Sequence, residues 1–322
     1  MKICVFGAGA VGSHFAVRLA LAGHDVSCVM RGTHLQAVQA KGLTLRLGGE
    51  QLSKKVRASD NPSKLGAQDL VISTLKANAL GSLAGGLTPL LKDDTAVVFA
   101  QNGIPWWYNI GLPADHPSTP PLDFLDPGGQ LQALLGRERI IGGVIFSSNE
   151  IVEPGVVVND SPERNMLIVG ECDDRQSDRI QGLRRLLTDA HIQSPPTMRI
   201  RESIWTKLIG NMTMSILCVL TGRSVRDSVT DPAIEPLVPR LLAEGQSVGQ
   251  AFYQGVARRG RSGPPINHKP SVLQDYERGR PMEIDALVQA PLAFARTAGI
   301  ATPMLDMMAG LATSRAREKG LY

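Results

Sequence analysis

Lys207 and Asn211 lie four residues apart next to Trp205, and together they suggest a place where a proton could be donated. Residues four apart share one face of a helix, and Ser215 continues this face one turn later. Burial lowers the pKa of a lysine, so a partly buried lysine can donate a proton near neutral pH. From spacing alone, a lysine whose ammonium group reaches solvent along its aliphatic chain is the simpler interpretation.

Two further polar groups follow predicted strands, and a third begins a predicted helix. Asn102-Gly103 and Lys76 come directly after apolar strands, where ligands bind in open α/β sheets. The alternative for Asn102-Gly103 is an ordinary turn, and the alternative for Lys76 is a surface lysine. Glu283 and Asp285 open a helix, where acids also stabilise the helix dipole without any chemical role. The histidines and cysteines lack the spacing of a metal site, so we expect no metal.

A glycine-rich turn near the N-terminus indicates a dinucleotide. An apolar strand at residues 2–6 enters it, and an alanine-rich helix at residues 10–22 leaves it. In this motif the first glycine permits the tight turn, the second lets a pyrophosphate approach and the third lets the helix pack closely. Free N–H groups at the helix start then favour phosphate, although a tight turn that binds nothing is the alternative. The motif residues are Gly7, Ala8, Gly9, Ala10, Val11 and Gly12.

The end of the second predicted strand favours NADP(H). NAD sites place an acidic residue there to bind the ribose 2′-hydroxyl. Here the strand at residues 25–30 is followed by Arg31, and Asp25 lies at its other end. A guanidinium suits a 2′-phosphate through charged hydrogen bonds, whereas a solvated surface charge is the alternative.

Composition fits a soluble metabolic enzyme with two domains. The 322 residues are 43% apolar and 20% charged, with a net charge of +4 and no basic run, which argues against nucleic acid. No apolar run reaches the length of about 18 residues that a membrane helix needs. The chain opens on a predicted strand, so we expect no signal peptide and a cytoplasmic location. The cysteines are dispersed, and Cys4 and Cys28 are expected to be buried free thiols.

Strand and helix patterns alternate in the first part of the chain, which predicts a mostly parallel α/β sheet of Rossmann type. Helical patterns follow the hinge Ser194-Pro195-Pro196, so we expect a nucleotide-binding domain at residues 1–196 and an all-α substrate domain at residues 197–322. Pro291 should kink or break its helix. Further strands are predicted at residues 43–47, 55–58, 69–74, 95–100, 140–148, 153–158 and 166–169. Further helices are predicted at residues 33–40, 79–90, 177–190, 201–220, 231–259, 271–274, 283–297 and 303–318.

The segment after Asn102 is unusual. Trp106-Trp107-Tyr108 precedes a proline-rich insert at residues 109–127, which predicts an exposed loop. Its aromatic side chains could close over a substrate. A mobile insert with its tryptophans packed on the domain edge is the alternative.

Taken together, these residues resemble the 2-dehydropantoate 2-reductases, also called ketopantoate reductases, over nearly the whole chain. The family has an N-terminal Rossmann-type domain, a helical C-terminal domain and an active site in the cleft between them. Besides the glycine-rich motif, the matching segments are Thr74-Leu75-Lys76-Ala77, Gln101-Asn102-Gly103, Leu135-Gly136, Trp205 to Asn211, Ser271 to Asp275, Glu283-Ile284-Asp285 and Gly299 to Pro303.

The resemblance implies a role for each candidate residue. Lys207 would be the general acid that protonates a ketone as hydride arrives from NADPH, and Glu283 would orient the substrate hydroxyl. Arg31 would bind the 2′-phosphate and Lys76 another part of the cofactor. Positions implied to bind substrate are Asn102, which also borders the nicotinamide ribose, Asn211, Ser215, where the family often has asparagine, and Ser271.

The reaction implied is the NADPH-dependent reduction of a 2-oxo acid, with 2-dehydropantoate to (R)-pantoate, a step of pantothenate biosynthesis, as the leading assignment. A bulkier 2-oxo acid or ketone is the first alternative, and a non-catalytic NADP(H)-binding protein is the second. We also keep a homodimer as a candidate assembly.

Overall fold

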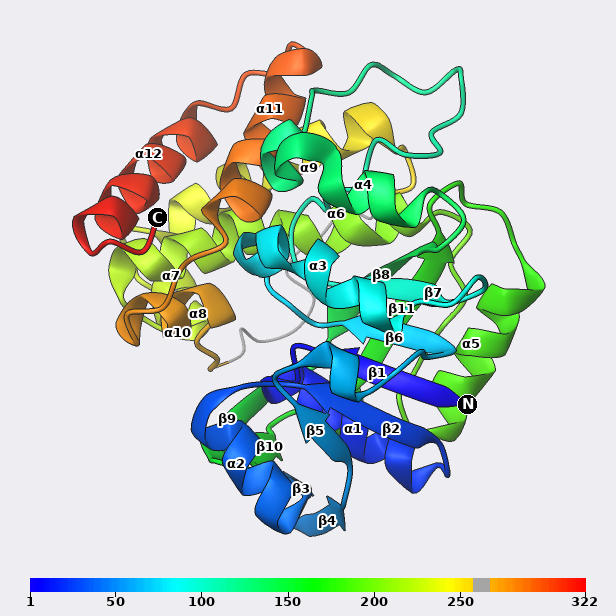
Figure 1. Ribbon diagram of the computed structural model, residues 1–322. Coiled ribbons are helices and arrows are strands. Elements are labelled where there is room, and N and C mark those ends of the chain that lie inside the picture. The colour runs from blue at the N-terminus through cyan, green and yellow to red at the C-terminus, as the bar shows by residue number, and fades with distance from the viewer. Residues whose placement is uncertain (257–266) are drawn as a thin grey trace. The chain divides into compact units, whose positions relative to one another are not determined.

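The computed structural model describes residues 1–256 and 267–322, and the chain forms two compact units (Figure 1). The first, here called the sheet unit, comprises Met1–Gln101 and Asp126–Ile200. The second, here called the helical unit, comprises Asn102–Leu125 and Arg201–Tyr322. The expected helical domain therefore begins within a few residues of the predicted hinge, but it also contains a segment that the sequence prediction placed in the first domain.

A seven-stranded sheet organises the sheet unit, in the order β11-β8-β7-β6-β1-β2-β5. All its pairings are parallel except that of β11 with β8, which confirms the mostly parallel sheet. Its central strands are continuous apolar runs because both faces are covered. The strands are β1 (Lys2–Phe6), β2 (Asp25–Val29), β5 (Arg57–Ser59), β6 (Leu70–Ser73), β7 (Ala96–Ala100), β8 (Ile140–Phe146) and β11 (Met166–Glu171).

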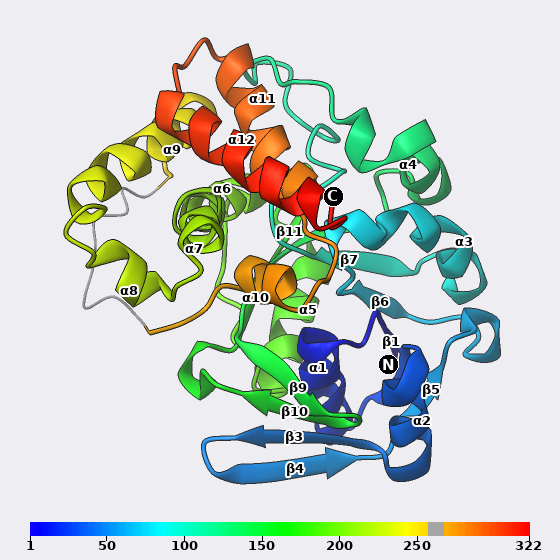
Figure 2. The ribbon, with the colours of Figure 1, turned by 90° about the vertical axis from the view of Figure 1, so that its left-hand side faces the viewer.

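A second sheet of four strands, in the order β4-β3-β10-β9, lies beside helix α1 (Figure 2). Its strands are β3 (Leu43–Leu47), β4 (Glu50–Lys54), β9 (Asn149–Glu153) and β10 (Val156–Asn159). The predicted strand at residues 55–58 is wrong in its bounds. The chain instead forms β4 as the return strand of a hairpin with β3, and then joins the main sheet through β5.

The helices of the sheet unit are α1 (Ala10–Leu21), α2 (Gly32–Lys41), α3 (Leu83–Leu87), α4 (Gln130–Leu135) and α5 (Asp178–Asp189). The single helix predicted at residues 79–90 is wrong. It is split into a 3₁₀ turn (Ala77–Ser82), α3 and a second 3₁₀ turn (Thr88–Leu90). Three glycines and Pro89 in this stretch lower its helix propensity, which explains the division.

The described helices of the helical unit are α6 (Ile200–Gly210), α7 (Ile216–Thr221), α8 (Val225–Val229), α9 (Val238–Phe252), α10 (Ser271–Glu277), α11 (Ala290–Thr297) and α12 (Pro303–Glu318). Two π-helical turns, η7 (Asn211–Ser215) and η9 (Asp285–Gln289), precede α7 and α11. The helix predicted from residue 231 begins only at Val238, after a 3₁₀ turn, because Pro236 and Pro239 restrict the backbone. Residues 257–259 of that prediction lie outside the described residues. Pro291 does not break its helix, because it lies in the first turn of α11 directly after η9.

The aromatic segment after Asn102 belongs to the core of the helical unit. Trp107 and Tyr108 are buried, as is Arg201, whose guanidinium Nε donates to the Tyr108 carbonyl at 2.9 Å. The same guanidinium lies 5.4 Å from the Trp107 ring centroid and 5.3 Å from that of Tyr108. Trp205 Nε1 donates to the Tyr108 hydroxyl at 2.7 Å. These side chains are packed in the core of the helical unit and do not form an exposed lid.

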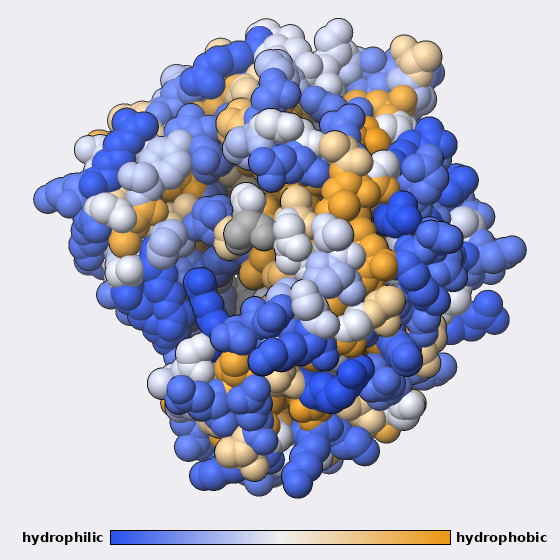
Figure 3. All heavy atoms as spheres, viewed as in Figure 1, coloured by the Kyte–Doolittle hydropathy of each residue, from blue (hydrophilic) through white to orange (hydrophobic). Residues whose placement is uncertain are grey.

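Most of the face shown in Figure 3 carries hydrophilic side chains. Among the described residues, one helical stretch, Ile200–Thr221, is long and apolar enough to cross a membrane, contrary to the expectation that no such stretch exists. The most apolar 18 residues of this stretch are 61% buried inside the protein. A core helix of a soluble protein can be equally long and apolar. The four cysteines are buried free thiols, as predicted for Cys4 and Cys28.

Candidate functional site

The glycine-rich turn connects β1 to α1, and steric contacts explain two of its three glycines. Gly7 has a φ of +86°, and an added Cβ would lie 2.6 Å from Leu75 Cδ2. At Gly12 an added Cβ would lie 2.5 Å from Thr74 Oγ1, whose hydroxyl donates to the Gly7 carbonyl at 2.8 Å. At Gly9 it would meet only the Gly7 carbonyl oxygen, 3.8 Å away. Position 9 therefore presents an open backbone, as the approach of a pyrophosphate requires.

The N-terminus of α1 can receive an anion. Gly9 occupies the N-cap position without a side-chain cap, and the first turn contains no acidic residue. Backbone N–H groups at such a helix start lack intrahelical partners and carry the positive end of the helix dipole. The residues of the motif thus fit the phosphates of a dinucleotide.

The start of α2 is connected to the glycine-rich turn through a partly buried chain of hydrogen bonds. The Gly155 N–H donates to His34 Nδ1 at 3.0 Å, so the neutral ring carries its proton on Nε2, 3.0 Å from Ser13 Oγ. The Ser13 hydroxyl in turn donates to the Ala8 carbonyl at 3.0 Å. Burial lowers the pKa of His34, which favours this neutral form. Sequence reasoning did not identify His34, because its two partners, Ser13 and Gly155, lie 21 and 121 residues away in the chain.

Arg31 and Lys76 both occupy N-cap positions near the carboxyl edge of the main sheet. Arg31 is exposed and extended before α2, whose first turn has no acidic residue. Lys76 is half-buried and follows β6 by three residues, next to Leu75, which contacts Gly7. The structure therefore places both cations on elements that border the glycine-rich turn.

In the helical unit, the polar row predicted on one helix face spans α6 and η7. Lys207 and Asn211 are half-buried, and Ser215 is 8% exposed. The opposite side of this helix carries Trp205 and Ile209, which are completely buried. One face thus anchors the helix in the core while the other presents polar groups.

Glu283 lies two residues before η9 and is only 4% exposed. An acid that merely compensates a helix dipole gains nothing from burial, and buried carboxylates require partners, so this burial weakens the purely structural interpretation. Asp285 differs, because it accepts a hydrogen bond from the Tyr322 hydroxyl at 2.6 Å. The Met282 N–H donates to the Leu321 carbonyl at 2.9 Å, so the chain before Glu283 is also fixed. Tyr322 was not identified from the sequence.

Asn102 is brought next to the segment that follows Glu283. Gly103 has a φ of +80°, and an added Cβ would lie 2.5 Å from the Ala286 carbonyl oxygen. The Ile104 N–H donates to that same oxygen at 2.9 Å. This contact shows that Asn102-Gly103 is more than an ordinary exposed turn, since only glycine allows the approach.

Ser271 is the exposed first residue of α10, and α10 packs against η7. The turn η7 also packs against η9. The structure therefore gathers the segments that carry Asn102, Asn211, Ser215, Ser271 and Glu283, with Lys207 one turn before Asn211. The sheet unit carries the remaining candidates, which are Gly7 to Gly12, Arg31 and Lys76.

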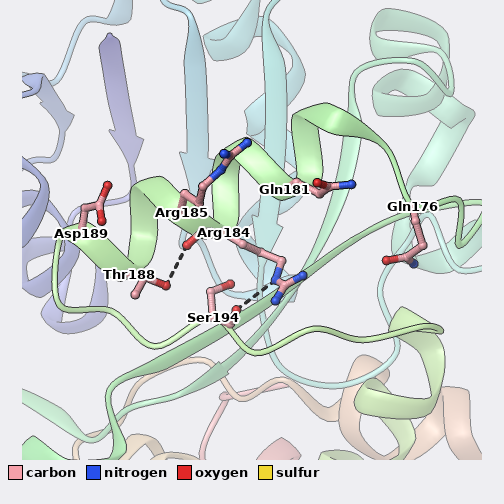
Figure 4. Close-up of a pocket in the computed structure, with 7 residues that line it drawn as sticks. All are labelled: Gln176, Gln181, Arg184, Arg185, Thr188, Asp189 and Ser194. Carbon is pink, nitrogen blue, oxygen red and sulfur yellow. Dashed lines mark hydrogen bonds between the residues drawn. The ribbon is translucent and has the colours of Figure 1, made fainter.

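A groove of about 460 Å³ runs along α5 in the sheet unit (Figure 4). Two of its side chains are fixed, since Arg184 Nε donates to the Ser194 carbonyl at 3.0 Å and the Thr188 hydroxyl donates to the Arg184 carbonyl at 2.9 Å. Its lining contains none of the predicted site residues. Within residues 1–256 and 267–322, no group of three or more His, Cys, Asp or Glu side chains could hold a metal ion.

Comparison with known proteins identifies two matching family models. The model described as ketopantoate reductase PanE/ApbA matches residues 3–109, and its C-terminal counterpart matches residues 199–316. A 2-dehydropantoate 2-reductase of Mesorhizobium japonicum is 40% identical over 328 residues, covering 100% of both chains. The structure of a Geobacter metallireducens 2-dehydropantoate 2-reductase has a TM-score of 0.81 at 26% identity, covering 98% of this chain and 99% of that one. A D-mandelate dehydrogenase with NADH and anilino(oxo)acetate shares the fold, with a TM-score of 0.82 at 22% identity and complete coverage of both chains.

Proposed function

This chain belongs to the ketopantoate reductase PanE/ApbA family, and from that premise we propose that it reduces 2-dehydropantoate to (R)-pantoate with NADPH, a step of pantothenate biosynthesis. The observation that carries the proposal is the 40% identity over the whole length to a 2-dehydropantoate 2-reductase. The arrangement of the helical unit supports it, because the helix of Lys207 packs through η7 against the segment that follows the buried Glu283.

The family uses a nicotinamide cofactor, and we propose NADPH as the one used here. The end of β2 lacks the acidic residue that a ribose 2′-hydroxyl would need, and Arg31 stands at the start of α2 instead. A guanidinium binds a 2′-phosphate through charged, paired hydrogen bonds. The glycine-rich turn would bind the pyrophosphate, and Lys76 would contribute a second cation.

The proposed mechanism assigns each step to residues of this chain. NADPH, when bound, supplies the hydride that reduces the keto carbon. Lys207 donates a proton to the ketone oxygen, because a developing alkoxide is stabilised by a nearby cation and proton source. Glu283 accepts a hydrogen bond from the substrate hydroxyl and orients it. Substrate is held by Asn102, Asn211, Ser215 and Ser271, with Ser271 toward the carboxylate.

Ser215 favours a second candidate substrate within the same reaction class. The family often has an asparagine here, and the shorter serine leaves more space next to Asn211 and Lys207. A 2-oxo acid with a larger side chain is therefore the alternative. The likeness to a D-mandelate dehydrogenase establishes the fold alone and does not decide between them.

Turnover distinguishes these possibilities. NADPH oxidation should be followed with ketopantoate and with a panel of 2-oxo acids of increasing side-chain size, and kcat/KM compared. The highest value for ketopantoate supports the proposal. A higher value for a bulkier acid would transfer the assignment to the alternative, and no turnover with any member would indicate a binding protein.

We also propose a cytoplasmic location and a homodimer. One family member of known structure is described as dimeric. On α12, Met307 and Leu311 are 61% and 52% exposed and lie four residues apart, so they form an apolar stripe that a second subunit could cover. Light scattering coupled to size-exclusion chromatography should give twice the chain mass, and Leu311→Lys should shift it toward the monomer.

A further inference from the structure

The helix of Lys207 contains a π-turn at the place where Ser215 would otherwise rotate away from the face that carries Lys207 and Asn211. In a regular α-helix, the residue eight positions after Lys207 is rotated by about 80° from it. A π-turn uses more residues for each turn, so the rotation per residue is smaller. Because η7 spans Asn211–Ser215, Ser215 rotates back toward the line of Lys207 and Asn211. Such turns are rare and frequently lie at functional sites.

Thr213, in the middle of η7, holds this turn from the opposite side. Its side chain is completely buried, and its hydroxyl donates to the Ile209 carbonyl at 2.5 Å. Thr213 lies two residues from both Asn211 and Ser215, so it points away from the polar row. It therefore does not belong to the groups expected to touch substrate.

Helix α9 fixes Thr213 in place. An added Cβ at Gly245 would lie 3.3 Å from Thr213 Cγ2 and 3.5 Å from Ile209 Cγ2. The absence of a side chain at Gly245 thus lets α9 approach the π-turn closely. Any displacement of Thr213 toward α9 is blocked by backbone.

The second π-turn is packed against the first. A small apolar cavity is lined by Met212 and Ile216 near η7, by Val288 and Leu292 near η9, and by two residues of α12. Because η7 and η9 pack against each other, a shift of η7 is transmitted to η9, which begins two residues after Glu283. The position of η7 therefore concerns both proposed catalytic side chains.

We propose that Thr213 is a positioning residue for the reductase reaction, whose hydrogen bond to Ile209 holds the π-turn that aligns Lys207, Asn211 and Ser215. The inference rests on the proposed function for the identity of the reaction. The simpler explanation is that Thr213 only satisfies a carbonyl, as threonines in helices commonly do. Thr221 provides the comparison, since its hydroxyl donates to the Leu217 carbonyl at 3.1 Å on the same helix outside the turn.

The test compares Thr213→Val, Thr213→Ser and Thr221→Val in the full-length protein. Thr213→Val removes the hydroxyl, and we expect kcat to fall roughly 10- to 100-fold, since a misplacement of about 1 Å can cost that much. Thr213→Ser keeps the hydroxyl and should therefore keep most of the wild-type kcat. Thr221→Val should lower the melting temperature without this loss of kcat. The Kd of NADPH should be the same in all three, because the residues proposed to bind its pyrophosphate and 2′-phosphate belong to the sheet unit.

A second variant covers the case in which Thr213→Val does not fold. Gly245→Ala pushes the Thr213 methyl from the side of α9 and should also lower kcat, whereas adding Thr213→Ser removes that methyl and should restore it. Gly310→Ala on α12 is the control, because an added Cβ there meets nothing within 4 Å. The inference is overturned if Gly245→Ala has wild-type kcat, as does Thr213→Val where it folds, while Lys207→Ala is inactive; the proposed function then stays intact. If the wild-type protein reduces no 2-oxo acid, this inference and the proposed function are both overturned.

Discussion

Alanine at positions 9 and 12 should separate cofactor binding from folding in the sheet unit. At Gly12, the added Cβ would lie 2.5 Å from Thr74 Oγ1 and 3.0 Å from the Gly7 carbonyl oxygen, so Thr74 has to move. Overpacking costs about 1–3 kcal/mol, and loss of the Thr74 hydrogen bond adds about 0.5–1.5 kcal/mol. The better helix propensity of alanine returns about 1 kcal/mol. We therefore expect Gly12→Ala to lower the free energy of unfolding by about 0.5–3.5 kcal/mol.

Gly9→Ala should behave differently. The added Cβ meets only one atom, at 3.8 Å, so no collision is expected, but the backbone ψ of −149° lies outside the regions that alanine prefers. The free energy of unfolding should therefore fall by about 1 kcal/mol, from backbone strain and not from a steric clash. NADPH affinity should nevertheless fall strongly, because the methyl group occupies the side from which a pyrophosphate approaches.

Two measurements on each variant distinguish a loss of stability from a loss of NADPH binding. Thermal unfolding reports stability, and a fluorescence titration with NADPH reports affinity. The double variant Gly12→Ala/Thr74→Ala removes the colliding oxygen and should recover part of the lost stability. The reasoning is refuted if Gly9→Ala binds NADPH like the wild type, or if Gly12→Ala unfolds at the wild-type temperature.

Three further predictions concern single side chains. Arg31→Ala should weaken NADPH binding about 10- to 100-fold, since a charged hydrogen bond contributes roughly 1.5–3 kcal/mol, and titration with NADH should show little change. Lys207→Ala should lower kcat by roughly 10²–10⁴-fold with unchanged NADPH affinity; near-normal turnover would remove Lys207 from the mechanism. Burial, and secondarily the nearby Arg18, lowers the pKa of His14 from 6.5 to about 4. Folding therefore favours its neutral form, so its stabilisation is complete above pH 6.5 and is lost as the pH falls toward 4. Urea unfolding across this range should show a steeper acid loss in the wild type than in His14→Gln, and parallel curves would contradict the assignment.

Sequence patterns predicted the main sheet because its strands carry their own signal. The run from Ile3 to Phe6 is apolar at every position, as a strand buried on both faces must be. The hairpin strand β4, Glu50–Lys54, is polar and largely exposed, so it has neither an apolar run nor an alternating pattern. It forms the return strand of a hairpin across Gly48-Gly49, and this two-residue glycine loop is the local signal that the analysis of strand patterns did not use.

Features that depend on distant partners could not be predicted in the same way. The burial of Arg201 requires carbonyls and rings from the segment around Tyr108. The π-turns have no signal in the amino-acid composition. They differ from an α-helix only in which backbone carbonyl accepts the hydrogen bond of each amide. The importance of Lys207 and Glu283 came from the order of several motifs along the chain, and the structure adds that Glu283 is buried.

The contact between Arg201 and the Trp107-Tyr108 segment also has a consequence for biosynthesis. The guanidinium and the Tyr108 carbonyl that it binds are 93 residues apart in the chain. At translation rates of about 5–20 residues per second, the aromatic segment leaves the ribosome roughly 5–20 s before its partner is made. During that interval two large aromatic side chains have no helical unit to cover them. A nascent chain stalled before residue 201 should therefore bind a hydrophobic chaperone through this segment, and release should coincide with the synthesis of α6.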